Sequence, residues 1–175
     1  LAATAKDLND VSAKGALSDA ALREAAEDFA EFGNLDETLK QDARSALQTR
    51  LELNQLEYTA LVSPEFRVIA QSASDRSGEL FNPNNLVSSA LRQSEPKSAI
   101  SLQTLPELQQ IGIRVPDRAN EAALVQYTVT PIFEGGTPTN RSGVRNTVIG
   151  ALVTGDIVNS DSAIVTESLT NFSEG

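Results

Sequence analysis

Two long apolar runs near the C-terminus constrain the fold more than any other feature of this sequence. They cover Ala122–Phe133 and Val144–Val158, and both are rich in Val, Ile, Thr and other strand-forming residues. The loop EGGTPTNRSG separates them, and Gly, Pro and Asn in such a loop mark a turn. The pattern predicts two strands joined by a long turn, followed by an amphipathic segment at Asn159–Phe172.

The N-terminal third has helical periodicity. Apolar residues recur at three- and four-residue spacing over Leu17–Phe32, which predicts a helix. Ser18 is the predicted N-cap of this helix and Gly33 its stop. A second helix is predicted over Asp36–Asn54. The segment Leu1–Ala16 has a weaker pattern and could be the membrane-proximal end of an incoming helix.

The middle of the chain alternates between strand and loop patterns. Pro64 presets a turn and lacks the N–H that a central strand needs, so the flanking apolar segments read as a hairpin. In chain order the predicted elements are strands at Leu56–Val62 and Phe66–Gln71, a polar loop at Ser72–Asn85, a short helix at Leu86–Arg92, a strand at Ser98–Leu105, and a loop or short helix at Pro106–Ala119.

This order of elements predicts an α+β fold. Five strands, interrupted after the second by a short helix, form an antiparallel sheet that carries helices on its faces. A chain of 175 residues is long enough for one domain with its own core. We therefore expect a single domain over residues 1–175, with helices in 1–54, the sheet core in 55–158 and an exit helix in 159–175.

Charge narrows the range of partners. The net charge of −10 argues against binding to nucleic acid, whose phosphates require Lys and Arg, and against docking on anionic lipid headgroups. The apolar stretches are shorter than the roughly 20 residues that span a bilayer. Any membrane-spanning segment is therefore expected to lie outside this sequence.

The residue types that are absent narrow the chemistry. The sequence has no Cys, which excludes disulfides and thiolate nucleophiles, and no His, the commonest general base and metal ligand. Asp156, Asn159 and Asp161 are spaced loosely like calcium ligands, but the glycine and the terminal Glu of an EF-hand loop are missing. We expect no enzyme activity, no cofactor and no metal site.

The segment EYTALVSPEFRVIAQSASDRSGELFNPNNLVSSAL resembles the Cache (PAS-like) extracytoplasmic sensor domains of bacterial membrane receptors, especially those of cyanobacterial histidine kinases and chemoreceptors. The residues that carry the resemblance are Glu57-Tyr58, Leu61-Val62, Arg67-Val68-Ile69, Arg76, Gly78-Glu79, Phe81-Asn82-Pro83 and Leu86-Val87, together with YTVTPIF (Tyr127–Phe133) and VIGALVTGDIVN (Val148–Asn159). The likeness covers Leu35–Phe172. The turn SPEF departs from the Asp- and Gly-rich turn that is commoner in such hairpins.

The resemblance implies a PAS-like five-stranded sheet and a periplasmic sensing role in an inner-membrane receptor. An incoming helix and an exit helix would connect the domain to membrane segments, and the output would be a kinase, a methyl-accepting domain or a cyclase. The implied ligand is a small organic acid or amino acid. Ligand contacts between the sheet and the loop Ser72–Asn85 would shift the arrangement of the terminal helices. A homodimer through the N-terminal helices is a possible assembly.

Candidate ligand-binding residues follow from their chemistry. Arginine recognises carboxylates in a bidentate manner, and tyrosine offers both an apolar ring and a polar tip. A carboxylate inside an apolar strand is costly to bury without a partner, which draws attention to the acidic residue near the end of the last strand. The candidates are Tyr58, Arg67, Arg76, Tyr127, Thr154 and Asp156.

Each candidate also has a purely structural interpretation. Asp156 could cap the segment that follows its strand, the two tyrosines could pack in the sheet, and the arginines could form internal ion pairs or stay exposed. The whole chain likewise has an alternative function, as a ligand-free structural or dimerisation module. An open, polar pocket beside Tyr127 would favour sensing, whereas a cavity filled by Leu and Val would favour the ligand-free module.

Overall fold

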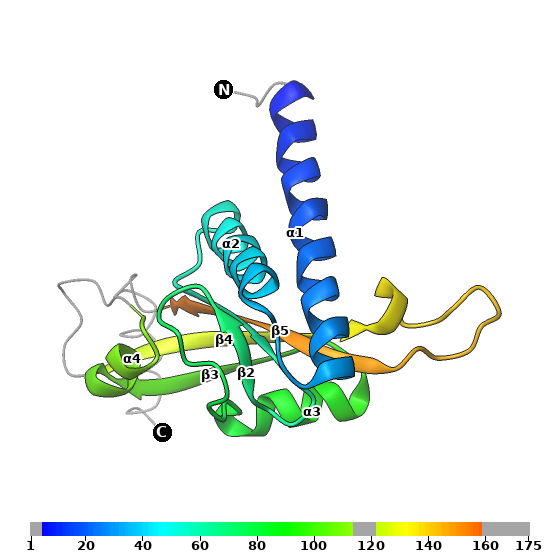
Figure 1. Ribbon diagram of the computed structural model, residues 1–175. Helices are drawn as coiled ribbons and strands as arrows, with labels where there is room; N and C mark the ends of the chain where they lie inside the picture. Colours follow the sequence, from blue (N-terminus) through cyan, green and yellow to red (C-terminus); the bar gives the residue numbers. More distant parts are fainter. Residues whose placement is uncertain (1–4, 114–121, 159–175) are drawn as a thin grey trace, which may run out of the picture.

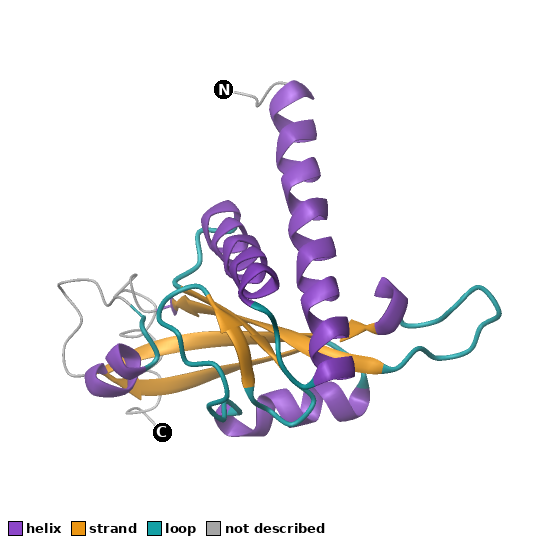
Figure 2. Ribbon diagram, in the orientation of Figure 1, coloured by secondary structure: helices purple, strands orange, loops and turns teal. Residues whose placement is uncertain are grey.

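A five-stranded antiparallel sheet with helices on both faces forms the body of the protein (Figures 1 and 2). The structure is a computed structural model that describes residues 5–113 and 122–158. Its main elements are α1 (Ala5–Phe32), α2 (Glu37–Leu53), β1 (Tyr58–Val62), β2 (Val68–Gln71), α3 (Leu86–Gln93), β3 (Lys97–Thr104), α4 (Leu105–Gln110), β4 (Ala122–Phe133) and β5 (Val148–Ile157). The predicted α+β class and antiparallel sheet are confirmed.

The strand order β2-β1-β5-β4-β3 places β5 at the centre of the sheet. The residues of β5 are buried almost without interruption. This burial explains why the sequence of the strand is largely apolar rather than alternating between apolar and polar residues. β3 is an edge strand, and its residues alternate between half-buried and exposed, with Ile100 and Leu102 facing solvent. The predicted strand at Ser98–Leu105 is therefore confirmed.

The two faces of the sheet carry separate apolar clusters. Tyr58, Phe81 and Tyr127 belong to the cluster on the face that α3 covers. On the opposite face, α1 and α2 pack through small residues and cover β1, β2 and β5. The residues buried in this second cluster are Leu22, Ala25, Ala26, Ala43, Ala46, Leu47, Leu61, Ile69, Ala70, Ile149 and Leu152.

The N-terminal helix differs from its prediction. α1 runs without a break through Ser18, which is therefore not an N-cap. Ser18 is buried, and its hydroxyl donates a hydrogen bond to the carbonyl oxygen of Ala46 on α2 at 3.0 Å. Tertiary packing against α2 thus uses the hydroxyl that local sequence reasoning assigned to capping. Gly33 ends α1 as predicted, with a φ of 75°.

The second helix matches its prediction closely. The Asp36 side chain accepts a hydrogen bond from the Leu39 N–H at 2.8 Å and caps α2, which ends at Leu53. The hairpin β1–β2 and the short helix α3 are also confirmed. The last strand begins at Val148 rather than at Val144, because the Val144 N–H is bound by the Asn140 side chain at 3.0 Å within the preceding loop.

The loop after β2 folds back along the open edge of the sheet. The Val68 N–H donates to the Glu79 carbonyl oxygen at 2.9 Å, and the Phe81 N–H donates to the Phe66 carbonyl oxygen at 2.7 Å. These bonds pair residues 79–81 with the start of β2. The loop therefore covers part of an otherwise free strand edge and fixes Phe81 over the α3-side face.

Several predictions fall on residues that the structure does not describe. These are the exit helix at 159–175, the segment 114–119 of the predicted loop or short helix, and the relative direction of the two chain ends. Within residues 5–113 and 122–158, none of the helices combines the length and apolar character that crossing a membrane requires. The assignment of all 175 residues to one domain stays a prediction.

The bond between α1 and α2 can be tested with a matched pair of variants. Ser18→Ala should lower the free energy of unfolding by about 1 kcal/mol more than Ser45→Ala, because only Ser18 loses a buried hydrogen bond. Ser45 is exposed on α2, so both variants gain the same helix propensity. Chemical denaturation measures the difference, and equal effects would contradict the proposed contact.

Candidate functional site

A row of three aromatic rings lies on the α3-side face of the sheet. Phe81, from the loop after β2, stands between Tyr58 on β1 and Tyr127 on β4, with ring centroids 5.5 Å and 5.8 Å away. In the strand register both tyrosines are paired with Gly155 of β5. The prediction that the two tyrosines lie on adjacent parts of one sheet is therefore confirmed.

Gly155 is what allows this row to form. A Cβ at this position would lie 3.2 Å from the Tyr58 Cβ and 3.3 Å from the Tyr127 Cε1. Both distances are tighter than ordinary van der Waals contact, so a side chain here would push one of the rings aside. The bare backbone of the central strand forms the floor on which both rings lie.

The inner end of the row is closed by a buried hydrogen-bond chain. The Tyr58 hydroxyl donates to Gln71 Oε1 at 3.1 Å, and Gln71 Nε2 donates to Ser74 Oγ at 3.1 Å. Tyr58 and Gln71 are both buried. Burial raises the pKa of Tyr58, and the nearby charge of Arg76 opposes that rise. This part of the interior is packed and satisfied rather than open to a ligand.

The outer end of the row opens into a pocket of about 310 Å³ beside Tyr127. Its walls come from the loop after β2, from β3 and β4, and from α4. The lining residues are Leu80, Phe81, Asn82, Pro83, Gln103, Glu107, Gln110, Ile111 and Tyr127. Several carry amide or hydroxyl groups, so the pocket has the mix of an aromatic wall and a few polar groups that small-molecule sites use.

Glu107 gives this pocket its charge. It is the single charged residue in the lining, and it also closes a capping box at the start of α4. Its carboxylate accepts hydrogen bonds from the Thr104 N–H at 2.7 Å and from the Thr104 hydroxyl at 2.9 Å, and these bonds lower its pKa. The pocket therefore holds a fixed negative charge at neutral pH.

The two candidate arginines bind within the loop. Arg67 donates to the Gly78 carbonyl oxygen at 2.7 Å, and Arg76 forms an ion pair with Glu79. Arg67 precedes β2 rather than lying within it, and it pairs with Leu80 in an isolated bridge. Both arginines thus bind within the segment that carries Phe81. These internal contacts agree with the structural interpretation of the two arginines rather than with a role in ligand binding.

Thr154 and Asp156 lie on the other face of the sheet from the tyrosines. They alternate along β5 with Val153 and Ile157, which belong to the α3-side cluster. Thr154 donates a long hydrogen bond of 3.5 Å to the Thr128 carbonyl oxygen. The structure therefore brings Tyr58 and Tyr127 together but does not bring all six candidates to one pocket.

Sequence reasoning missed most of the pocket lining. Gln103, Glu107 and Gln110 come from β3 and α4, whose approach to Tyr127 depends on strand pairing across distant segments. The one local signal was the T-x-x-E pattern of Thr104 and Glu107, which indicates a capping box and hence a helix start but no ligand. In the described part of the chain, no group of three or more acidic side chains could hold a metal ion.

Comparison with solved structures identifies the fold. The sensor domain of the histidine kinase DctB from V. cholerae is similar over 77% of this chain and 43% of its own chain, with a TM-score of 0.50 and 13% sequence identity. The chain has an α+β fold of the PAS/Cache-like type. At this identity the likeness is one of fold alone, and the chain spans less than half the length of the DctB sensor domain.

Two further solved structures are similar at a TM-score of 0.45, which is too low to carry an argument. They are the GAF domain of nlh2 from A. aeolicus (12% identity, 93% of this chain and 88% of that one) and the ligand-binding domain of the chemoreceptor Tlp3 from Campylobacter jejuni in complex with 4-methylisoleucine (12% identity, 84% and 55%). No protein-family model and no curated protein matches the sequence. The suggested cyanobacterial source gains no support from these comparisons.

The buried tyrosines of this fold predict a distinctive alkaline titration. Burial, and then the charge of Glu107, raise the pKa of Tyr127 to about 12. A tyrosine in an unfolded chain has a pKa of about 10. The contribution of the buried Tyr127 phenol to the free energy of unfolding is therefore fully present below about pH 10. It is lost as the pH rises toward 12, because the unfolded state loses the phenolic proton first.

The measurement is the ultraviolet absorbance of phenolate, followed together with far-UV circular dichroism. We expect no phenolate signal at about pH 10 while the protein is folded, and simultaneous ionisation of both tyrosines when it unfolds. The same titration in urea supplies the control. A phenolate signal with a midpoint near 10 and native dichroism would contradict the burial of the aromatic row.

Proposed function

We propose that this chain is an extracytoplasmic sensor domain of a membrane receptor of the histidine kinase or chemoreceptor type, and that it binds a small metabolite beside Tyr127. The observation that carries the proposal is the polar pocket at the outer end of the aromatic row. Its volume is suited to a metabolite with a few functional groups. The Cache-like fold is consistent with this role but does not by itself establish it.

The charge of the pocket narrows the ligand class. An organic acid without an amine would meet Glu107 as a like charge, and both candidate arginines are engaged elsewhere in the loop. An amino acid or another amine-bearing metabolite could place its ammonium group on Glu107 and its apolar part on Phe81 and Tyr127. We therefore propose an amino acid rather than a simple organic acid.

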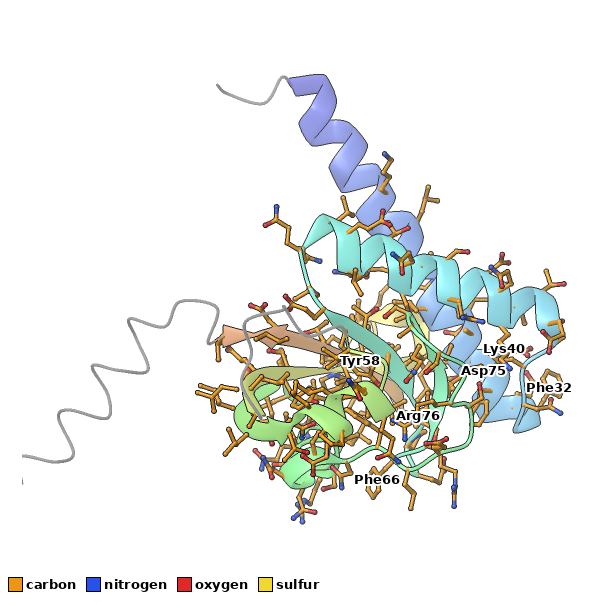
Figure 3. All side chains as sticks on the ribbon, turned by 90° about the vertical axis from the view of Figure 1, so that its left-hand side faces the viewer. Phe32, Lys40, Tyr58, Phe66, Asp75 and Arg76 are labelled. Carbon is orange, nitrogen blue, oxygen red and sulfur yellow. The ribbon has the colours of Figure 1, made fainter. Side chains whose placement is uncertain are left out.

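The loop Ser72–Asn85 is the proposed route from pocket to helices. Leu80–Pro83 line the pocket, while the earlier part of the loop contacts α2. Lys40 forms an ion pair of 2.7 Å with Asp75 (Figure 3). Arg44 donates a hydrogen bond to the Ala73 carbonyl oxygen at 3.2 Å. Ligand contacts that favour one loop arrangement would thereby bias α2 and the helix α1 packed on it.

The ligand class can be tested by thermal shift with matched compounds. Amino acids should raise the melting temperature, whereas their 2-hydroxy-acid analogues, which lack the ammonium group, should not. Glu107→Gln should weaken binding by about tenfold or more, because the charge is lost while Gln can still cap α4. Glu95→Gln is the matched control, since Glu95 is exposed and lies outside the pocket. Equal responses of the two variants, or of the paired compounds, would contradict the proposal.

The alternative function, a ligand-free dimerisation module, has one observation in its favour. Leu17 on α1 is 72% exposed, and a large apolar side chain on a long helix is a natural dimer contact. A homodimer through the N-terminal helices is compatible with sensing as well. An absence of any stabilising metabolite together with a stable dimer would favour the ligand-free module.

The dimer contact has its own pair of variants. Leu17→Glu should raise the dimer dissociation constant by about tenfold or more, because it places two charges in an apolar contact. Leu102→Glu is the control, since Leu102 is 69% exposed on the edge strand β3, whereas the strands that pack on α1 are β4 and β5. Sedimentation velocity measures both. A wild-type monomer at high concentration, or equal effects of the two variants, would argue against a dimer through α1.

A further inference from the structure

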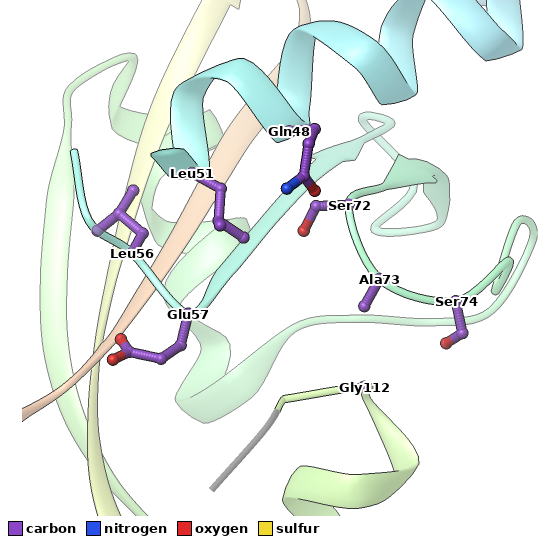
Figure 4. A pocket seen from close by; sticks show the side chains of 8 residues that line it. All are labelled: Gln48, Leu51, Leu56, Glu57, Ser72, Ala73, Ser74 and Gly112. Carbon is purple, nitrogen blue, oxygen red and sulfur yellow. The ribbon is translucent and has the colours of Figure 1, made fainter. Parts of the chain in front are cut away.

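A large cavity in the described part of the protein is separate from the pocket beside Tyr127. It has a volume of about 680 Å³ and lies between the C-terminal end of α2, the residues that lead into β1, the segment after β2 and the turn after α4 (Figure 4). Its lining residues are Gln48, Leu51, Leu56, Glu57, Ser72, Ala73, Ser74 and Gly112. None of them lines the Tyr127 pocket.

The lining has two distinct ends joined by an apolar wall. Leu51 and Leu56 form the wall, and the Glu57 carboxylate lies at one end, directed toward the end of β5 (Figure 4). The hydroxyls of Ser72 and Ser74 lie at the other end. No lining residue is a Lys or an Arg, and Glu57 is the one ionisable side chain among the residues that line the cavity.

Glu57 is held in place without a cationic partner among the described residues. One carboxylate oxygen accepts a hydrogen bond from the Ile157 N–H at 3.1 Å. Burial raises the pKa of Glu57, and the neighbouring Asp156 raises it further. A positive charge at this end of the cavity would offset the repulsion between the two carboxylates and stabilise the ionised form of Glu57.

We propose that this cavity is a second binding site, for a small organic amine whose ammonium group binds Glu57. The apolar body of the amine packs along Leu51 and Leu56, and a polar group at its far end hydrogen-bonds with Ser72 or Ser74. The observations behind this assignment are the size of the cavity, its single carboxylate and the distribution of apolar and polar groups along it. It does not depend on the ligand proposed for the Tyr127 pocket.

The position of the site suggests what an occupant would influence. Ser74 is hydrogen-bonded to Gln71, which in turn accepts the hydrogen bond of the Tyr58 hydroxyl, and Tyr58 packs on Phe81. Gly112 approaches so closely that a Cβ there would lie 2.7 Å from the Ala73 Cβ. The amine site is thus in direct contact with the start of the loop and with the end of α4, both of which continue into the Tyr127 pocket.

The test uses 6-aminohexan-1-ol as the probe and hexane-1,6-diol as its neutral counterpart. Nitrogen–proton correlation spectra of the whole chain should show shifts at Ser72–Ser74 and Gly112 on addition of the amine and not of the diol. Glu57→Gln should weaken amine binding by about tenfold or more, and Gln can still accept the Ile157 hydrogen bond. Glu65→Gln, an exposed carboxylate in the turn between β1 and β2, is the matched control.

Two further variants separate this site from other interpretations. Gln48→Lys places an internal ammonium in the cavity and should abolish amine binding without changing Glu57, and Gln48 is exposed, so the fold is retained. Glu107→Gln should leave the shifts at Ser72–Ser74 unchanged, so a failure of the Tyr127 site would be seen independently. Equal binding of amine and diol, no shifts at the cavity, or unaltered binding in Glu57→Gln would overturn the proposal.

Discussion

The absence of a Cβ at Gly155 is the constraint on which the row of three aromatic rings depends. Because the central strand presents only backbone there, Tyr58 and Tyr127 can both lie against it from the two neighbouring strands. Phe81 then fits between them and fixes the loop after β2 over the sheet. The pocket beside Tyr127 lies where this row ends, next to α4. There the side chains of Gln103, Glu107 and Gln110 line the pocket in place of further aromatic rings.

Local signals in the sequence were sufficient for the elements that depend on local physics. The largely apolar run of β5, the strand pattern of β3, the start of α2 next to Asp36 and the Gly33 stop of α1 all follow from burial, pleat and local helix signals, and each is present in the structure. Ser18 was misread because its partner, the Ala46 carbonyl, is on another helix. No sequence pattern near Ser18 indicates this contact with a residue 28 positions away.

The composition of the site depended on register, which the sequence does not reveal. Thr154 and Asp156 were candidates alongside Tyr127 because of their side-chain chemistry, but the pairing of Tyr127 with Gly155 puts these two polar side chains on the opposite face. A shift of one residue would have reversed that result. Glu107 was overlooked for the same reason, since only the pairing of β3 with β4 brings α4 toward the tyrosine.

The length of α1 has a mechanical consequence. Only its C-terminal part packs on α2 and the sheet, while the N-terminal part projects beyond them (Figure 1). Its 28 residues correspond to a rod of about 42 Å. The arm from Ala5 to Leu22, where α1 rests on the sheet, is about 26 Å. A tilt of about three degrees at Leu22 would therefore move the far end by about 1.4 Å, within the range of known signalling displacements of helices. Under the proposed function the helix would act as a lever arm, so that a small change in packing between the alanines of α1 and α2 would produce a larger displacement at its far end.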